Sequence, residues 1–129
     1  MVYIVWRKNY SVGVPSLDAQ HEKLVGIINT LYDRIRAGKG AEGIVKVLDE
    51  LSAYADSHFR HEEALMGEAR YPGLKDQEIS HNAYRARVLE LGKTFQKQPL
   101  QVLEFLKEWW LTHITKSDML YKDALSGKD

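Results

Sequence analysis

The chain has 129 residues, of which 44% are hydrophobic, and this is enough to bury the core of one domain without crosslinks. It has no cysteine, which excludes disulfides, thiolate metal sites and iron–sulfur clusters. Eighteen basic and eighteen acidic residues are interspersed, and no stretch has the length of a membrane span or the order of a signal peptide. We therefore expect a single domain over residues 1–129, in a cytoplasmic protein that binds neither nucleic acid nor membranes.

The predicted elements are separated by glycine and proline residues. Residues 1–16 are expected to form an extended N-terminal arm packed across the rest of the chain. Four segments with helical periodicity follow, each with one apolar stripe, at about 18–37, 41–68, 76–96 and from Pro99 onwards. Their connections are short, so neighbouring helices are expected to run antiparallel. The sequence thus predicts an all-α fold, an up-down-up-down four-helix bundle over residues 17–125 with the extended arm at its N-terminus.

Every predicted helix places a histidine within its apolar stripe. These histidines are His21, His58, His81 and His113, and Glu62 adds a carboxylate to the second helix. One such histidine alone is more often a hydrogen-bonded core residue than a ligand. However, each unpartnered buried imidazole costs roughly 1 to 3 kcal/mol, against a total stability of only about 5 to 15 kcal/mol. A bound cation removes that cost, so the four histidines together predict a metal site.

The spacing within the helices brings some of these donors together. His58 and Glu62 lie four residues apart, about one helical turn, and so enter the same layer of the bundle. His61 lies off the stripe and is expected to face solvent or to support a ligand. Asp118 follows His113 by five residues, about 140° further round an ideal helix, so periodicity alone makes it a surface aspartate. Donors in excess of one ion's needs favour two ions bridged by carboxylates, with iron ranked above zinc and manganese.

Four motifs carry a resemblance to a known family. They are VGVPSLDAQHEKLVGIINTLYD, HFRHEEALM with the following YPGL, the segment around His81, and WWLTHITKSDMLY. With them, almost the whole chain resembles the hemerythrins, and in particular the single-domain bacteriohemerythrins. The resemblance implies two iron ions with an oxo or hydroxo bridge, and binding of O2 or another small diatomic or anionic ligand at the iron with an open position. It assigns His21 and His58 to that iron, His81 and His113 to the other, and Glu62 and Asp118 to both as bridges.

The sequence departs from this family at Gln77. The segment after YPGL usually supplies two histidines four residues apart, and here only His81 is present. Three groups could fill the missing position: the side-chain oxygen of Gln77, a carboxylate oxygen of Glu78, or water. Gln77 occupies the stripe position itself, whereas Glu78 is expected on the solvated side of the helix, so Gln77 and water rank ahead of Glu78.

A second departure concerns the expected O2 pocket. In the family the residue three before the last histidine is commonly leucine, and here it is Trp110. Trp109 matches the family's usual tryptophan, and Leu24 and Ile114 are further apolar residues expected to line the pocket. Apolar walls would keep water away from bound oxygen. The alternative is that all four side chains are ordinary bundle core.

These observations lead to three functional hypotheses from different classes. The first is an oxygen-binding protein, not an enzyme, that carries, stores or senses O2 with an altered ligand set at Gln77. The second is a di-iron enzyme that turns over peroxide or nitric oxide. The third is a regulatory bundle whose metal site is impaired by the substitution. The sequence favours the first hypothesis and identifies no protein partner.

Overall fold

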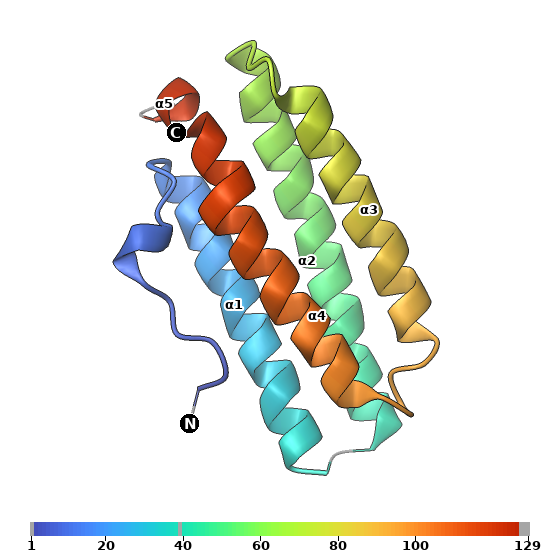
Figure 1. The fold of residues 1–129 in the computed structure, drawn as a ribbon. Helices are drawn as coiled ribbons and strands as arrows, with labels where there is room; N and C mark the ends of the chain where they lie inside the picture. The colour runs from blue at the N-terminus through green and yellow to red at the C-terminus, as the bar shows by residue number, and fades with distance from the viewer. Residues whose placement is uncertain (1, 39, 127–129) are drawn as a thin grey trace.

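A computed structural model describes residues 2–38 and 40–126, which contain four long helices lying side by side (Figure 1). They are α1 (Pro15–Arg36), α2 (Ala41–Glu68), α3 (Leu74–Gly92) and α4 (Pro99–Thr112). Successive helices run in opposite directions, and α1 and α3 each pack against both α2 and α4. The predicted all-α, up-down-up-down four-helix bundle is therefore confirmed. None of the helices in the described part of the chain combines the length and apolarity that crossing a membrane requires.

Two helix ends differ from the predicted ones, each for a local reason. Helix α1 begins at Pro15, three residues before the predicted start, because proline suits the first helical position and an extended Val14 precedes it. Helix α3 ends at Gly92 rather than near residue 96. The amides of Lys93 and Thr94 bond to carbonyls only three residues back, which tightens the end of the helix into a turn before α4.

Beyond Thr112 the chain stays helical, but its pitch changes from α to π, then to 3₁₀ and back to α. The next segments are a π-helix, η2 (His113–Ser117), a 3₁₀-helix, η3 (Asp118–Tyr121), and a last short turn, α5 (Lys122–Leu125). A π turn holds one residue more than an α turn, and such turns are frequent at functional sites. Here the widened turn lies between His113 and Asp118.

The N-terminal arm lies along the bundle, as expected (Figure 1). It includes a short 3₁₀ turn, η1 (Lys8–Tyr10). The Ile4 amide donates to Asn29 Oδ1 at 2.8 Å, and Asn29 Nδ2 donates to the Ile4 carbonyl at 2.9 Å. Tyr3 stacks on Tyr32 with ring centroids 4.6 Å apart. These contacts hold the arm against α1.

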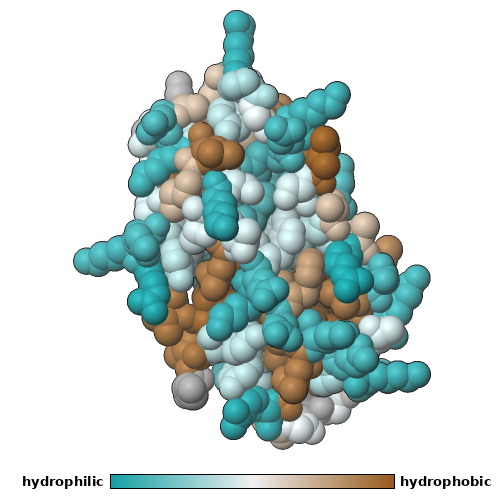
Figure 2. Space-filling model, viewed as in Figure 1, coloured by the Kyte–Doolittle hydropathy of each residue, from teal (hydrophilic) through white to brown (hydrophobic). Residues whose placement is uncertain are grey.

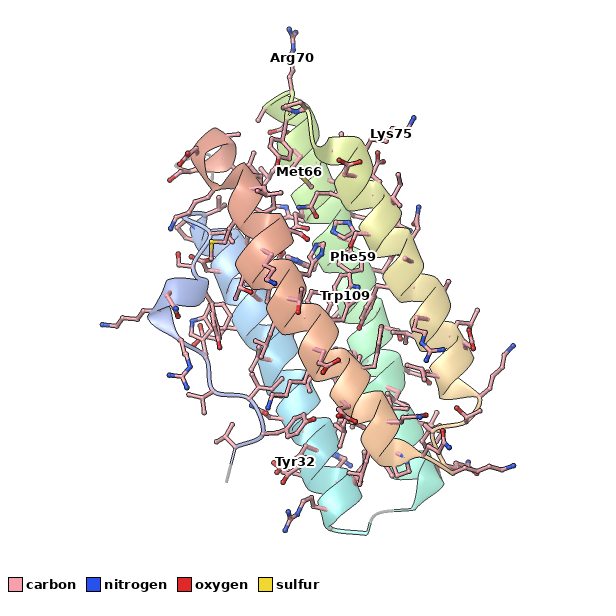
Figure 3. All side chains as sticks on the ribbon, in the orientation of Figure 1. Tyr32, Phe59, Met66, Arg70, Lys75 and Trp109 are labelled. Atoms are coloured by element: carbon pink, nitrogen blue, oxygen red, sulfur yellow. The ribbon has the colours of Figure 1, made fainter. Side chains whose placement is uncertain are left out.

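Apolar side chains fill the bundle in two clusters separated by a polar layer. The larger cluster includes Leu24 and Phe59, and the smaller one includes Leu17 and Met66. Figure 3 shows that Met66 lies nearer the α2–α3 turn than Phe59, and the polar residues of α2 fall between them in the sequence. Outside the core, hydrophilic side chains spread over the face seen in Figure 2, with apolar groups gathered toward its lower half. The polar layer is therefore enclosed by apolar packing at both ends.

Candidate metal centre

The polar layer consists of seven side chains that are buried in the described part of the chain. Each residue is at most 5% exposed, and the set is His21, His58, Glu62, Gln77, His81, His113 and Asp118. It contains every residue predicted as a metal ligand except Glu78, which faces solvent on α3. His61 is half-buried, and its Nε2 lies 3.0 Å from Ser16 Oγ. The bundle has thus gathered the predicted donors, while their role as ligands stays a prediction.

Six of these residues supply donor atoms that fall into two groups. The first group contains one atom each from His21, His58, Glu62 and Asp118, all within 4.8 Å of one another. The second contains one atom each from Glu62, His81 and His113, within the same limit. Glu62 belongs to both groups. Two neighbouring cation sites that share a carboxylate are therefore possible.

Both carboxylates direct one oxygen toward each group. Glu62 Oε2 lies 3.4 Å from His58 Nε2, and Glu62 Oε1 lies 2.9 Å from His81 Nε2. Asp118 repeats this division, because its Oδ2 lies 3.2 Å from His21 Nε2 and its Oδ1 lies 3.1 Å from His113 Nε2. This is the arrangement that carboxylates bridging two metal ions require.

The position of Asp118 overturns the surface location that helical periodicity indicates. The side chain is fully buried, and it faces the same layer as His113. In an ideal α-helix the fifth residue is displaced by about 140°, but the π turn of η2 takes up the extra residue. Asp118 therefore comes close to the direction that a residue four places after His113 would have. The resemblance placed it correctly in this layer, and periodicity alone did not.

Several buried donor atoms have no hydrogen-bond partner within the described residues. They are His21 Nδ1 and Nε2, His58 Nε2, Glu62 Oε1, Gln77 Oε1 and Asp118 Oδ2. His21 Nε2 and Asp118 Oδ2 are 3.2 Å apart, but they are not oriented as a hydrogen bond. Unpaired buried polar atoms cost free energy, and a cation coordinated by nitrogen and carboxylate oxygen removes that cost. The donors fit two metal ions, and imidazole with carboxylate is a donor set that suits iron.

The outer nitrogens of three histidine rings are held by neighbouring side chains. The contacts are His58 Nδ1 to Gln20 Oε1 at 2.7 Å, His81 Nδ1 to Glu63 Oε2 at 2.7 Å, and His113 Nδ1 to Ser80 Oγ at 3.3 Å. An Nδ1–H that donates outward leaves the Nε2 lone pair for a metal and fixes the ring orientation. Gln20, Glu63 and Ser80 were missed from the sequence. Each of them is the residue next to a predicted ligand in the sequence, and this adjacency is the signal that could have identified them.

Removing the Glu63 carboxylate should weaken metal binding. Glu63 contacts the ring of His81, and loss of such a partner typically costs about 10 to 100-fold in metal affinity. We expect this loss in Glu63→Ala, measured by competition with a chelator of known affinity. Glu68→Ala is the matched control, because Glu68 is exposed at the end of the same helix. Equal affinities of the two variants would contradict a supporting role for Glu63.

Aromatic rings flank the two groups of donors. Phe59 stacks on His81 with centroids 3.9 Å apart, and Trp109 stacks on His113 at 4.4 Å. Trp110 lies beside His58 at 5.9 Å. The predicted pocket residues Leu24, Trp110 and Ile114 are fully buried, whereas Trp109 is half-buried. The two tryptophans therefore lie against different groups, with Trp110 on the His58 side.

The side-chain amide of Gln77 has a defined orientation. Its Nε2 donates to the Ser117 carbonyl at 3.0 Å and to Asp118 Oδ1 at 3.2 Å. Two acceptors fix the nitrogen end of the amide, so Oε1 is the end left without a partner. Because Glu78 is exposed, the arrangement favours Gln77 or water over Glu78 at the missing position.

The charges of the layer shift the pKa values of its histidines. Burial lowers the pKa of His21, but the neighbouring Asp118 and Glu62 outweigh it and raise this pKa to about 9. Burial lowers the pKa of His58. Burial raises the pKa of Glu62, but His58, His21 and His81 bring it well below its usual range. In the metal-free protein, protonated His21 thus partly replaces a cation.

The metal-free protein should therefore lose stability as the pH rises from about 6.5 to about 9. The pKa of His21 is higher in the folded state than its ordinary value of 6.5, so its contribution is complete below 6.5 and is lost through 9. The loss is on the order of 3 kcal/mol, and it is measured by urea denaturation after chelation. In His21→Gln the free energy of unfolding should fall less steeply over this pH range. A free energy of unfolding that does not change with pH in the unsubstituted protein would contradict this role of His21.

Comparisons with known proteins show similarity to one family over nearly the whole chain. The model of the hemerythrin HHE cation binding domain matches residues 12–125. A bacteriohemerythrin of Pseudomonas paraeruginosa (strain PA7) is 33% identical over 128 residues, which are 97% of this chain and 83% of the relative. A bacteriohemerythrin of Methylococcus capsulatus (strain Bath) is 29% identical over 132 residues, covering 98% of this chain and 100% of the relative.

Solved structures extend the similarity to the fold. A crystal structure of wild-type hemerythrin matches with a TM-score of 0.85 at 27% identity, over 97% of this chain and 99% of that chain. A leucine-to-alanine variant of hemerythrin matches with a TM-score of 0.87 at 28% identity, over 98% and 100% of the two chains. The similarity therefore covers nearly the whole chain and is not confined to the motifs around the histidines.

Proposed function

The chain belongs to the hemerythrin family, and on this premise we propose that it binds O2 reversibly at a non-heme di-iron centre, for O2 carriage, storage or sensing. The observation that carries the proposal is the division of both carboxylates, Glu62 and Asp118, between two groups of histidines. Such a layer suits two metal ions better than one. Bound iron supplies the electrons that reversible O2 binding requires.

Each residue of the layer has a distinct role in this proposal. His21 and His58 hold the iron that takes O2, and Trp110 beside His58 shields that iron from water. His81 and His113 hold the other iron. Glu62 and Asp118 would bridge the pair, and the Tyr121 hydroxyl orients Glu62 by donating a hydrogen bond to Oε2 at 2.6 Å. An oxo or hydroxo group would complete the bridge.

Gln77 gives the second iron an altered ligand set. Its Nε2 donates to two acceptors, so Oε1 is the atom that it can offer to a metal. An amide oxygen is neutral, like the imidazole that it replaces, but it binds a metal more weakly than imidazole does. This substitution favours a second candidate function, in which the same two irons turn over peroxide or nitric oxide. A third, impaired regulatory bundle would keep fewer than two irons.

One experiment separates these functions. The metal-free protein is loaded anaerobically with ferrous iron, the metal is counted, and visible spectra are recorded before O2 is admitted, after it, and after its removal. We expect two irons per chain and an absorption band that appears with O2 and disappears when O2 is removed. Irreversible oxidation of two irons would instead favour the enzyme, and repeated turnover with a reductant would establish it. Retention of fewer than two irons would favour the impaired bundle.

Trp110→Leu should speed the exchange of small ligands such as azide at the O2-binding iron. Trp110 is fully buried beside His58, and its indole donates to the Tyr84 hydroxyl at 3.0 Å, which holds the ring in place. Leucine is smaller and would open the space over this iron. Stopped-flow mixing of azide with the ferric protein measures the rate, which we expect to increase severalfold.

Tyr84→Phe is the matched control for this substitution. It removes the same hydrogen bond but keeps the bulk of Trp110, so azide exchange should stay slow. Equal exchange rates in Trp110→Leu and the unsubstituted protein would place Trp110 in the core and not over the open iron.

A further inference from the structure

Two cavities open beside the second group of donors, where helix α3 meets the π-helix η2, and the larger one extends along α4. The larger, of about 290 Å³, is lined by His113, Trp109, Ser80 and Ser117 among others. The smaller, of about 130 Å³, is lined by Gln77, Ser80 and Ser117 among others. We call them the α3–η2 cavities. Since Ser80 and Ser117 line both, the two cavities adjoin, and together they lead to His113 and Gln77.

The second group of donors lies beside these cavities. It contains two imidazoles and, like the first group, faces one oxygen of each of Glu62 and Asp118, so the further donor that it can use among the described residues is the neutral amide of Gln77. Gln77 lies at the inner wall of the smaller cavity, 5% exposed, with an unpartnered Oε1. A neutral amide oxygen binds metal weakly, so an incoming molecule can displace it.

The lining of the cavities indicates the chemical class of that molecule. Asp76 lies at the smaller cavity and Glu108 at the larger one, and both are exposed acidic residues that repel anions. Ser80 and Ser117 offer hydroxyl groups within. A volume of about 130 Å³ next to Gln77 admits only a small molecule. These features suit a small neutral species over azide or another anion.

We propose that the metal held by His81 and His113 has an exchangeable ligand position beside Gln77, which small neutral molecules such as nitric oxide reach through the α3–η2 cavities. The position is separate from the one on the His58 side, so two exogenous molecules can bind to one protein. This inference rests on the proposed di-iron function. It adds a second entrance, lined by Ser80 and Ser117 and not by Trp110.

The test is an anaerobic titration of the diferrous protein with nitric oxide, the probe. Bound nitric oxide is quantified chemically after its release from the desalted protein, against a metal count on the same sample. We expect two molecules per chain in the unsubstituted protein and one in Gln77→His, in which an imidazole fills the position. Retention of two irons with one nitric oxide in the unsubstituted protein would overturn this inference and leave the proposed function intact. Retention of fewer than two irons would overturn both.

A pair of variants on η2 tests the route. Ser117→Leu narrows both cavities but keeps the backbone carbonyl that accepts from Gln77, so we expect loss of the second nitric oxide. Lys116→Leu adds the same side chain to the same segment at an exposed position outside the cavities, and it should still bind two. Two molecules bound in Ser117→Leu at an unchanged rate would exclude this route, and one bound in Lys116→Leu would count equally against it.

Discussion

Glu62→Ala is expected to abolish the retention of both iron ions. Glu62 belongs to both groups of donors, and its two oxygens lie toward His58 and His81. Asp118 also directs an oxygen toward each side, but among the described residues only Glu62 supplies an atom to both compact groups. The substitution also leaves the Tyr121 hydroxyl without its acceptor in a buried position. Iron per chain, counted after gel filtration, should fall from two to near zero.

Glu50→Ala provides the control for this loss, because Glu50 is an exposed residue of the same helix. That variant should retain iron as the unsubstituted protein does. Far-ultraviolet circular dichroism of Glu62→Ala distinguishes a folded bundle without metal from an unfolded chain. A folded Glu62→Ala protein with two tightly held irons would show that Glu62 does not bridge the metals.

Loading with iron should raise the melting temperature by a large amount. The metal-free layer leaves buried imidazole and carboxylate atoms without partners, and metal binds to the folded arrangement of these atoms. Free metal at about 1,000 times its dissociation constant adds about 4 kcal/mol to stability. For a chain of this size that corresponds to a shift of roughly 10 to 20 °C. Differential scanning calorimetry of anaerobic metal-free and ferrous samples measures it.

Two samples identify the source of such a shift. Glu62→Ala with the same iron should melt at the temperature of its own metal-free form, because it lacks the shared ligand. Calcium added to the unsubstituted protein should have no comparable effect, since calcium prefers sites built from oxygen donors. Equal melting temperatures for the metal-free and iron-loaded protein would mean that iron does not bind in the buried layer.

The helices could be predicted because their periodicity is local, but their ends could not be placed with the same accuracy. The stripe through His21 and Leu24 identifies α1 whatever it packs against. The start at Pro15 and the end of α3 at Gly92 depend on which backbone groups find partners at each terminus. Those partners depend on the turn that joins two packed helices. The periodicity of the sequence therefore misplaced both helix ends by several residues.

The candidate ligands likewise include five residues that helical periodicity placed correctly and one, Asp118, that it did not. His21, His58, Glu62, His81 and His113 lie on stripes of regular helix, so their arrangement in one layer follows from the pattern. Asp118 does not, because a π turn changes the rotation per residue, and ideal helical geometry gave the wrong face. Only the resemblance to the hemerythrins placed it correctly.

The amino-acid sequence was sufficient to predict the fold class and the buried donors His21, His58, Glu62, His81 and His113, because these follow from apolar periodicity and residue type. The resemblance carried by its motifs indicated the family and the place of Asp118. The tertiary structure was needed for everything that depends on contacts between helices. It showed the Glu63 carboxylate on His81, the Gln77 amide on Ser117, and the division of each carboxylate between two groups. Such contacts join side chains from different helices or across a widened turn. The pattern of residues within one helix does not determine how far its side chains lie from those of another helix.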